Sequence, residues 1–298
     1  GAVSMKTSTS KRLRWNVAIW LAAGLFMTST AGMASGPIMP DPKAEARHQP
    51  QIEETANGIP LVNITAPSSG GVSRNEYETF NVPDKGAILN NSYTLSKTEL
   101  AGYVQGNNNM AERPAKIIVN EVTGAGSTSM DGFLEVAGNR ADVVIANPNG
   151  ITVNGGGFIN TGKAFLTTGK PVYDGEDHLQ RFDITGGDIL IEGKGLGGKE
   201  TGSLAILSRA VKINAGIWAK DLHITTGANT VDAKTLEASA IEGKGGRPAF
   251  ALDTAAIGGM YAGRITLVGT EKGLGVNNSG TWSAEENLIL DWNGDLKN

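Results

Sequence analysis

The side chains that could carry out acid–base, nucleophilic or metal chemistry in this sequence are few and far apart. Cysteine is absent from the 298 residues, which excludes disulfides, thiolate metal sites and a cysteine nucleophile. The three histidines, His48, His178 and His223, stand in dissimilar contexts. A histidine-based metal site or catalytic triad therefore has little support.

A glycine pattern typical of phosphate-binding loops occurs in GKGLGGKE at 193–200. Such a loop needs a helix N-terminus directly after its glycines. The segment that follows, TGSLAILSRAVKI, has the pattern of a β-strand, and Glu200 stands where a serine or threonine would hold magnesium. We therefore interpret these glycines as a loop at a corner between strands, and the sequence indicates no cofactor.

Acidic residues gather in two polar segments, YDGEDH at 173–178 and DWNGD at 291–295. The first has the composition of a solvated turn. The second resembles the start of a calcium loop, but the glutamate that would complete the loop would fall after residue 298. We expect neither segment to bind a metal, and we predict that the chain is not an enzyme.

Asparagine is the remaining residue type with a suggestive spacing. NNNM at 107–110 and NPNG at 147–150 each contain asparagines two positions apart. Asparagine side chains can bond to their own backbone, Pro148 fixes φ, and Gly150 tolerates a positive φ. By chemistry alone, both segments are tight corners between strands.

The elements that would carry these corners are short and extended. From residue 56 onward, segments such as FLEVAG (133–138), ADVVIA (141–146) and RITLVG (264–269) alternate with turns rich in Gly, Asn, Asp or Pro. The best helical candidate, SKTELAGYVQG at 96–106, is short. The stretch from 141 to 170 could form a hairpin, but we interpret it as a coil of a β-solenoid.

A weak internal repeat supports the solenoid. GIWAKDLHI at 216–224 matches GMYAGRITL at 259–267, and GTWSAEENLIL at 280–290 repeats the theme with two residues inserted before Leu288. Repeated strand–turn units bury their apolar faces by stacking on one another. A Greek-key sandwich, the competing architecture, would not require this repeat. Trp218, Tyr261 and Trp282 occupy the repeated aromatic position, so we expect them to pack.

The start of the chain has the pattern of an export signal over residues 5–34. Four basic residues precede the apolar stretch WNVAIWLAAGLFM, and Gly32 and Ala34 suit the −3 and −1 positions of a signal-peptidase site, with cleavage after Ala34. A membrane anchor is the alternative, but the apolar run is short for a membrane span. Residues 1–4 precede Met5, and we interpret them as a cloning remnant or as the result of a wrongly assigned translation start.

Removing residues 1–34 takes away four positive charges and no negative ones, so the net charge changes from −4 to −8. The remaining basic residues are scattered, and we expect no nucleic-acid partner. Residues 35–55 are polar and contain several prolines, which predicts a mobile leader. Residues 291–298 begin another strand–turn unit, so we expect the chain to be the N-terminal piece of a longer repetitive protein.

Several blocks in the same order resemble the N-terminal secretion (TPS) domain of two-partner-secretion exoproteins. They include GIPLVNITAPSSGGVSRNEYETFNV, AKIIVNEVTG, FLEVAGNRADVVIANPNGITVNGGGFINT and GGMYAGRITLVGTEKGLGV. The resemblance covers about residues 56–290. It implies a right-handed parallel β-helix with an N-terminal antiparallel cap and small β elements outside the helix. It also implies a cognate outer-membrane transporter that reads the domain through its periplasmic POTRA domains.

The resemblance gives the two asparagine segments a role in secretion. The family's Asn-Pro-Asn-Gly turn falls on Asn147, Pro148, Asn149 and Gly150, and its Asn-Pro-Asn-Leu motif falls on Asn107, Asn108, Asn109 and Met110. Asn108 replaces the usual proline, so the first turn lacks a fixed φ. Many family members carry a Cys-x-x-Cys where this chain has Asn154 and Gly157, so no local disulfide can form here.

We therefore expect the secretion-targeting domain of a large exoprotein, exported through the periplasm to the surface of a Gram-negative bacterium. Its parent most resembles contact-dependent growth-inhibition toxin carriers. A filamentous adhesin or haemolysin of the same family is the alternative, and a polysaccharide-active β-helix enzyme is a weaker one. A domain that itself binds carbohydrate is a third; exposed aromatic residues would favour it, but the repeat positions of Trp218, Tyr261 and Trp282 indicate packing instead. We expect a monomer, and a target-cell receptor would belong to the full-length protein.

Overall fold

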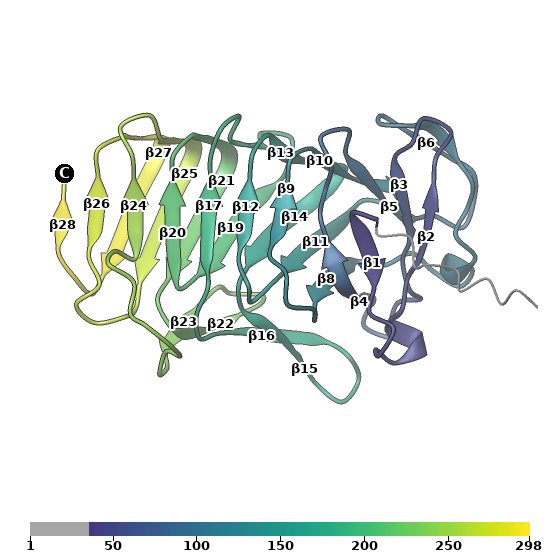
Figure 1. Ribbon diagram of the computed structural model, residues 1–298, viewed down its shortest axis with the longest axis horizontal. Coiled ribbons are helices and arrows are strands. Elements are labelled where there is room, and N and C mark those ends of the chain that lie inside the picture. Colours follow the sequence, from purple (N-terminus) through teal and green to yellow (C-terminus); the bar gives the residue numbers. More distant parts are fainter. Residues whose placement is uncertain (1–35) are drawn as a thin grey trace, which may run out of the picture. The chain divides into compact units, whose positions relative to one another are not determined.

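Parallel strands stacked in successive coils make up most of the structure, a computed structural model that describes residues 36–298. Figure 1 shows the coils advancing from the purple N-terminal part to residue 298, in yellow. The expected signal peptide and its cleavage position, Ala34, lie outside the described residues. The fold is the predicted all-β class, a right-handed parallel β-helix. A hairpin at 141–170 is excluded, because β11 (Ala141–Ala146) and β14 (Thr161–Thr167) pair in parallel.

Each coil contributes strands to three faces of the β-helix. The first face contains β5 (Ala87–Asn91), β10 (Phe133–Gly138), β13 (Gly156–Ile159) and β18 (Leu196–Gly198). The second face contains β8 (Ile117–Val122), β11, β14 and β19 (Ser203–Ser208). The third face contains β9 (Thr128–Met130), β12 (Ile151–Val153), β17 (Asp188–Ile191), β20 (Ala210–Ile213), β24 (Leu252–Thr254), β26 (Val276–Asn278) and β28 (Leu296–Lys297). Three later strands run across both the first and second faces: β21 (Gly216–Thr226), β25 (Gly259–Gly269) and β27 (Thr281–Trp292).

Aliphatic side chains at equivalent positions of successive coils form columns inside the β-helix. One column on the second face consists of Ile145, Leu166, Ile206, Ile224 and Leu267, all fully buried. Burying one such side chain stabilises the fold by about 1.5–3 kcal/mol. Because neighbours in a column belong to different coils, each coil is stabilised mainly by the coils on either side of it.

The pairing of β21 with β25 confirms the repeat that the sequence predicts. Gly216 pairs with Gly259 and Trp218 with Tyr261, and the register continues to the ends of both strands. The third copy differs from the prediction. Trp282 pairs with Met260, one position away from the aromatic row, and its indole nitrogen donates to the Thr254 hydroxyl at 3.1 Å. The insertion in the third copy shifts the register, which the sequence alignment could not reveal.

Two groups of strands lie outside the β-helix. The helical candidate at 96–106 instead contains an antiparallel hairpin of β6 (Ser96–Thr98) and β7 (Gly102–Val104), whose turn includes Gly102 at φ 66°. The second group is an antiparallel sheet of β15 (Lys170–Tyr173), β16 (Leu179–Ile184), β22 (Asn229–Asp232) and β23 (Ala238–Ala240). Phe182 of this sheet is fully buried in a separate apolar cluster against the second face.

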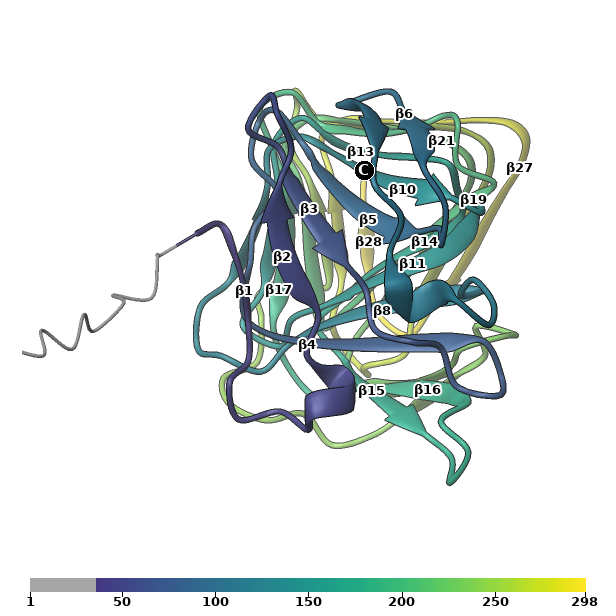
Figure 2. The same ribbon diagram turned by 90° about the vertical axis from the view of Figure 1, so that its right-hand side faces the viewer.

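Residues 36–55, which the sequence predicts to be a mobile leader, are instead part of a folded cap. β1 (Ile38–Pro40) pairs antiparallel with β4 (Val72–Phe80), and β2 (Gln51–Glu54) pairs antiparallel with β3 (Pro60–Asn63). Figure 2 looks onto this end of the β-helix, where β2 and β3 lie in front of the coils. The cap covers the strand edges of the first coil, which would otherwise be exposed.

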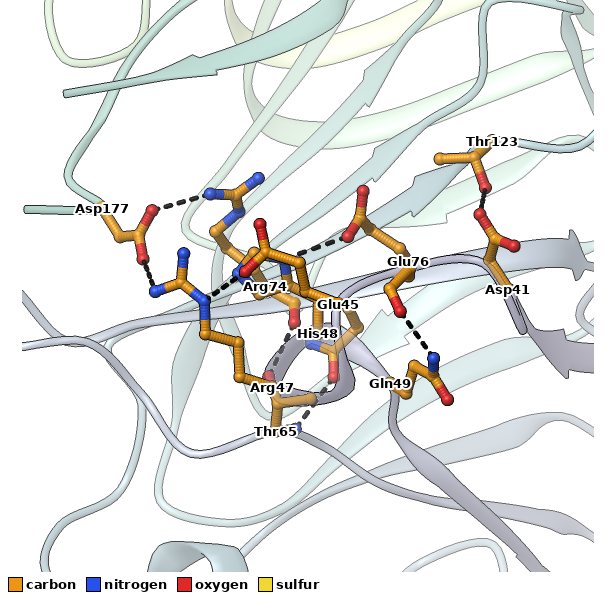
Figure 3. A network of polar contacts seen from close by, with 12 residues as sticks. Asp41, Glu45, Arg47, His48, Gln49, Thr65, Arg74, Glu76, Thr123 and Asp177 are labelled. Atoms are coloured by element: carbon orange, nitrogen blue, oxygen red, sulfur yellow. Dashed lines mark hydrogen bonds and ion pairs between the residues drawn. The ribbon is translucent and has the colours of Figure 1, made fainter. Parts of the chain in front are cut away.

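A polar network holds this cap in place (Figure 3). Asp177, from the loop between β15 and β16, accepts from Arg74 at 2.7 Å and from Arg47 at 3.2 Å. His48 is buried in the short helix η1 (Ala46–His48), and its Nδ1 lies 3.0 Å from a Glu76 carboxylate oxygen. The partners of residues 47 and 48 lie far along the chain, which is why local composition did not reveal that this segment folds.

Candidate functional site

The turn at 147–150 joins β11 of the second face to β12 of the third face. Its first residue, Asn147, is fully buried, and its Nδ2 donates to the Gly126 carbonyl and to the Thr128 hydroxyl, each at 2.9 Å. Both acceptors belong to the corresponding corner of the preceding coil. The Gly150 N–H donates to the Asn147 carbonyl at 3.1 Å, which closes the turn.

The second asparagine of this turn strengthens the same contact. The Asn147 side-chain oxygen accepts from the Asn149 backbone N–H at 2.9 Å and from Asn149 Nδ2 at 3.0 Å. Asn149 Nδ2 also donates to the carbonyls of Gly124, at 2.8 Å, and Gly126, at 3.2 Å. Gly150 has φ 110°, in the region that favours glycine. The two asparagines thus hold the turn in shape and fasten it to the coil below.

The segment at 107–110 repeats this arrangement at the cap. Asn107 is 2% exposed, and its Nδ2 donates to the carbonyls of Ile64 and Asn90, each at 2.9 Å. Its side-chain oxygen accepts from the Asn109 N–H at 3.0 Å, and Asn109 Nδ2 donates to the same Ile64 carbonyl at 3.0 Å. The turn continues into the short helix η2 (Asn108–Met110).

The two segments, which we call the clasp turns (107–110 and 147–150), therefore share one geometry. In each, a buried first asparagine accepts from the backbone N–H two residues later, and both asparagines donate to one carbonyl of the preceding layer. A buried asparagine amide without hydrogen-bond partners would destabilise the fold. Each turn is therefore stable in this conformation only when the preceding layer, which supplies the acceptors, is in place. The clasp turns thus couple the folding of one coil to that of its neighbour.

The residues of the clasp turns differ in their access to a partner. Asn108, Pro148 and Asn149 are exposed, whereas Met110 is 2% exposed and packs in the main core. Any surface that a partner could contact is therefore made by the second and third residues of each turn.

Asn108 occupies a position that suits the proline it replaces. Asn107 has ψ 114°, in the extended region that a following proline requires. The Asn108 side chain is exposed, and its backbone N–H donates to no group within residues 36–298. The proline is therefore dispensable here, because the hydrogen bonds of Asn107 and Asn109 already define the turn.

Comparisons with known proteins agree with this geometry. The sequence profile of the TPS secretion domain matches residues 37–298. The chain belongs to the TPS secretion domain family. The profile begins near residue 37 rather than near 56, in agreement with the folded cap.

Two curated relatives and one solved structure illustrate the similarity. The chain is 46% identical over 268 residues to "Toxin CdiA" of Yersinia pestis, which covers 89% of this chain. It is 47% identical over 249 residues, 82% of this chain, to "16S rRNA endonuclease CdiA" of Enterobacter cloacae subsp. cloacae. The matched region is 8% of the length of each relative. The crystal structure of the filamentous hemagglutinin secretion domain superposes with a TM-score of 0.73 at 30% identity, covering 88% of this chain and 97% of that one.

Membership defines the general role of the chain. A TPS secretion domain is a targeting domain rather than a catalytic one, and it implies a cognate outer-membrane transporter. Exoproteins of this family and the CdiA proteins are secreted by the two-partner pathway of Gram-negative bacteria.

The glycine-rich and acidic segments singled out in the sequence form structural elements of this TPS secretion domain. The glycines at 193–198 form a corner and the short strand β18, and they are followed by strand β19 rather than by a helix. Asp177 belongs to the cap network. Within residues 36–298, no group of three His, Cys, Asp or Glu side chains is placed to hold a metal ion, and no helix is long and apolar enough to cross a membrane.

One pair of carboxylates beside the cap has unusual electrostatics. Glu76 of β4 and Glu121 of β8 are paired in the ladder between these strands. Burial of Glu121, and then repulsion from Glu76, raises the pKa of Glu121 to about 7, although Lys170 and Arg74 oppose the shift. We therefore expect the stability of the strand pair β4–β8 to decrease as the pH rises through neutrality.

Proposed function

We propose that this chain is the N-terminal secretion-targeting domain of a contact-dependent growth-inhibition toxin carrier. The observation that carries the proposal is the similarity to relatives named CdiA, 46% identical over 268 residues and 47% identical over 249 residues, of which the chain spans 8%. The toxin activity would belong to the part of the parent protein outside this chain. The nuclease activity in one relative's name is a property of that relative.

We propose the following organisation of the chain. Residues 5–34 are a signal peptide cleaved after Ala34, and residues 1–4 are a remnant ahead of it. Residues 291–298 lead into the next repeat of a longer exoprotein; they contain the end of β27 and the third-face strand β28, which stacks in parallel on β26. The secreted form would then start with the folded cap.

We propose that the clasp turns act in export in two linked ways. Their exposed residues, such as Pro148 and Asn149, contribute to the surface that the periplasmic POTRA domains of the transporter read. Their buried asparagines fasten the first coils together as the chain emerges at the cell surface, so that later coils can stack on a formed template. Both turns lie in the first half of the domain, which supports a role early in folding.

Deletion of residues 56–170 tests the targeting role. The deletion removes both clasp turns, and we expect the precursor to stay in the periplasm when the cognate transporter is co-expressed. Removal of the extra-helical segment 234–248, which lies outside the three faces of the β-helix, serves as the control and should leave export intact. Efficient release of the 56–170 deletion would exclude the targeting role.

A filamentous adhesin or a haemolysin is the second candidate for the parent, because the filamentous hemagglutinin secretion domain shares this fold. The reading frame after residue 298 distinguishes the candidates. A C-terminal toxin domain followed by a neighbouring immunity gene is expected for a growth-inhibition protein. A long adhesive repeat array without such a gene would favour the adhesin.

A further inference from the structure

A row of outward-facing residues crosses the first face at one register position of six neighbouring strands. The pairing places these residues side by side in the order Phe133, Gly157, Gly197, Trp218, Tyr261 and Ser283. Parallel strands are about 4.8 Å apart, so the three aromatic residues span roughly 19 Å. Phe133 and Tyr261 are each 40% exposed.

Glycines beneath the rings shape this row. A Cβ at Gly157 would overlap the Phe133 ring, and a Cβ at Gly216 would overlap the Trp218 indole. A Cβ at Gly259 would likewise meet the Tyr261 ring. The repeated Gly-apolar-aromatic pattern in the sequence therefore has a physical meaning. Gly216 and Gly259 each lie two residues before an aromatic residue on the same face of the strand. Because they have no side chain, the rings of Trp218 and Tyr261 can lie flat against the sheet.

The row lies in a long groove. Beside the β6–β7 hairpin the groove has a volume of about 1120 Å³, and a second stretch of about 690 Å³ continues past Tyr261. Trp218 and Lys199 line both stretches, so the two stretches adjoin at these residues. The rings of Trp218 and Tyr261 are nearly parallel, with an interplanar angle of 16° and centroids 6.1 Å apart.

The charges around the groove are balanced. The first stretch is lined by three basic and three acidic residues: Lys97, Arg140, Lys199, Glu99, Glu135 and Glu200. Of these, Glu135 is 4% exposed, and its carboxylate accepts from the backbone N–H groups of Glu99 and Leu100. The second stretch also contains three of each sign. Within residues 36–298, Lys97, Arg140 and Lys199 form no ion pair, so their N–H groups are available to a ligand. A balanced lining does not favour a polyanion or a strongly charged peptide.

Beneath the aromatic rings, the groove lacks the feature that would bind a peptide through its backbone. The strands there, β10, β13, β18, β21 and β25, are each paired on both sides, whereas β27, which lines the far end of the second stretch, is paired with β25 alone within residues 36–298. No free strand edge lies under the rings for strand addition. Flat rings bordered by separate donors and acceptors instead match a ligand that has apolar faces and hydroxyl edges.

We propose that this groove binds an oligosaccharide chain without net charge. The chain lies along the aromatic row, with the C–H faces of its rings on Phe133, Trp218 and Tyr261 and its hydroxyls toward the lysine and glutamate side chains. Such a site would let the secreted domain hold a surface glycan, independently of the transporter.

Binding of uncharged hexaoses (cellohexaose, maltohexaose and laminarihexaose) to the domain from residue 35 to 298 tests the proposal. We expect at least one of them to bind, detected by saturation-transfer NMR and by tryptophan fluorescence. Trp218→Ala and Tyr261→Ala should each weaken binding by about tenfold or more, since central aromatic contacts dominate such interfaces. Trp218→Phe, which keeps a ring, should retain most of the affinity. Tyr93→Ala is the matched control, because Tyr93 is 55% exposed but lies outside the groove.

Melting curves and secretion of the same variants separate this site from export. Tyr261→Ala should melt near the unmodified domain and should be secreted normally. The proposal is overturned if no uncharged hexaose binds, or if both alanine variants bind as tightly as the unmodified domain. A heparin hexasaccharide that binds more tightly than every uncharged hexaose would also overturn it.

Discussion

Replacing Asn149 by alanine removes the exposed half of the second clasp turn and leaves the buried half in place. The Asn149 amide donates to the Gly124 and Gly126 carbonyls and to the Asn147 side chain. Because Asn149 is exposed, water can replace it at these acceptors, and we expect a loss of about 1 kcal/mol. For a domain of this size that corresponds to a Tm decrease of about 2–4 °C. Asn147→Ala should cost more, about 2–4 kcal/mol, because it leaves buried groups without partners.

The assay measures the secreted fraction with the cognate transporter and the melting curve of each purified variant. Asn160→Gly is the matched control, because Asn160 Nδ2 donates to the Val136 carbonyl at 2.8 Å and to the Gly138 carbonyl at 3.0 Å at a different corner. Asn160 has φ 56°, so glycine removes the amide without backbone strain. We expect Asn149→Ala to lose most of its secretion and Asn160→Gly to keep it at similar stability. If secretion follows Tm across all three variants, the clasp turns have no role beyond structure.

Asn108→Pro should leave secretion unchanged and raise the unfolding free energy by up to about 1 kcal/mol, measured by denaturant titration, and a large destabilisation would contradict the account of that turn. Because the pKa of Glu121 is raised from 4.5 to about 7, its contribution to stability is complete below pH 4.5 and is lost as the pH rises through 7. Glu121→Gln should flatten this pH dependence of the denaturation midpoint, and an unchanged slope would refute the assignment. Deleting residues 36–55 should lower the Tm by uncovering the first coil, and an unchanged Tm would mean that the cap adds no stability.

Much of the β-helix could be predicted because its signals are local. The strands at 133–138 and 141–146 have the predicted limits, and the repeat at 216–224 and 259–267 is in the predicted register. Each of these depends on alternating apolar residues and on turn residues that lie next to them in the sequence.

The features that escaped prediction depend on residues distant in sequence. The cap is folded because β1 pairs with β4, and Arg47 adds a contact to the distant Asp177. The segment at 96–106 is a hairpin packed on the first face. The hydrogen bond from the Asn147 side chain to the Gly126 carbonyl can form only after two coils have stacked. The sequence predicted a turn there, but it could not predict which groups of the preceding coil the turn binds.

The aromatic residues of the repeat also differ from the prediction. Trp218, Tyr261 and Trp282 were expected to pack as one repeated set. In the structure the first two line an open groove, while Trp282 is shifted by one position and packs partly against the core. A one-residue change of register reverses which face of a strand a side chain occupies, so an inserted residue changes its environment completely.

We propose that this chain is a secretion signal read by a dedicated transporter, and comparing its secretion with and without that transporter tests this directly. The chain is expressed with its own signal peptide, with and without the cognate outer-membrane transporter, and the extracellular and periplasmic fractions are compared. We predict that the chain reaches the medium only when the transporter is present and otherwise accumulates in the periplasm. Release that is equal with and without the transporter, or retention in both cases, would contradict the claim.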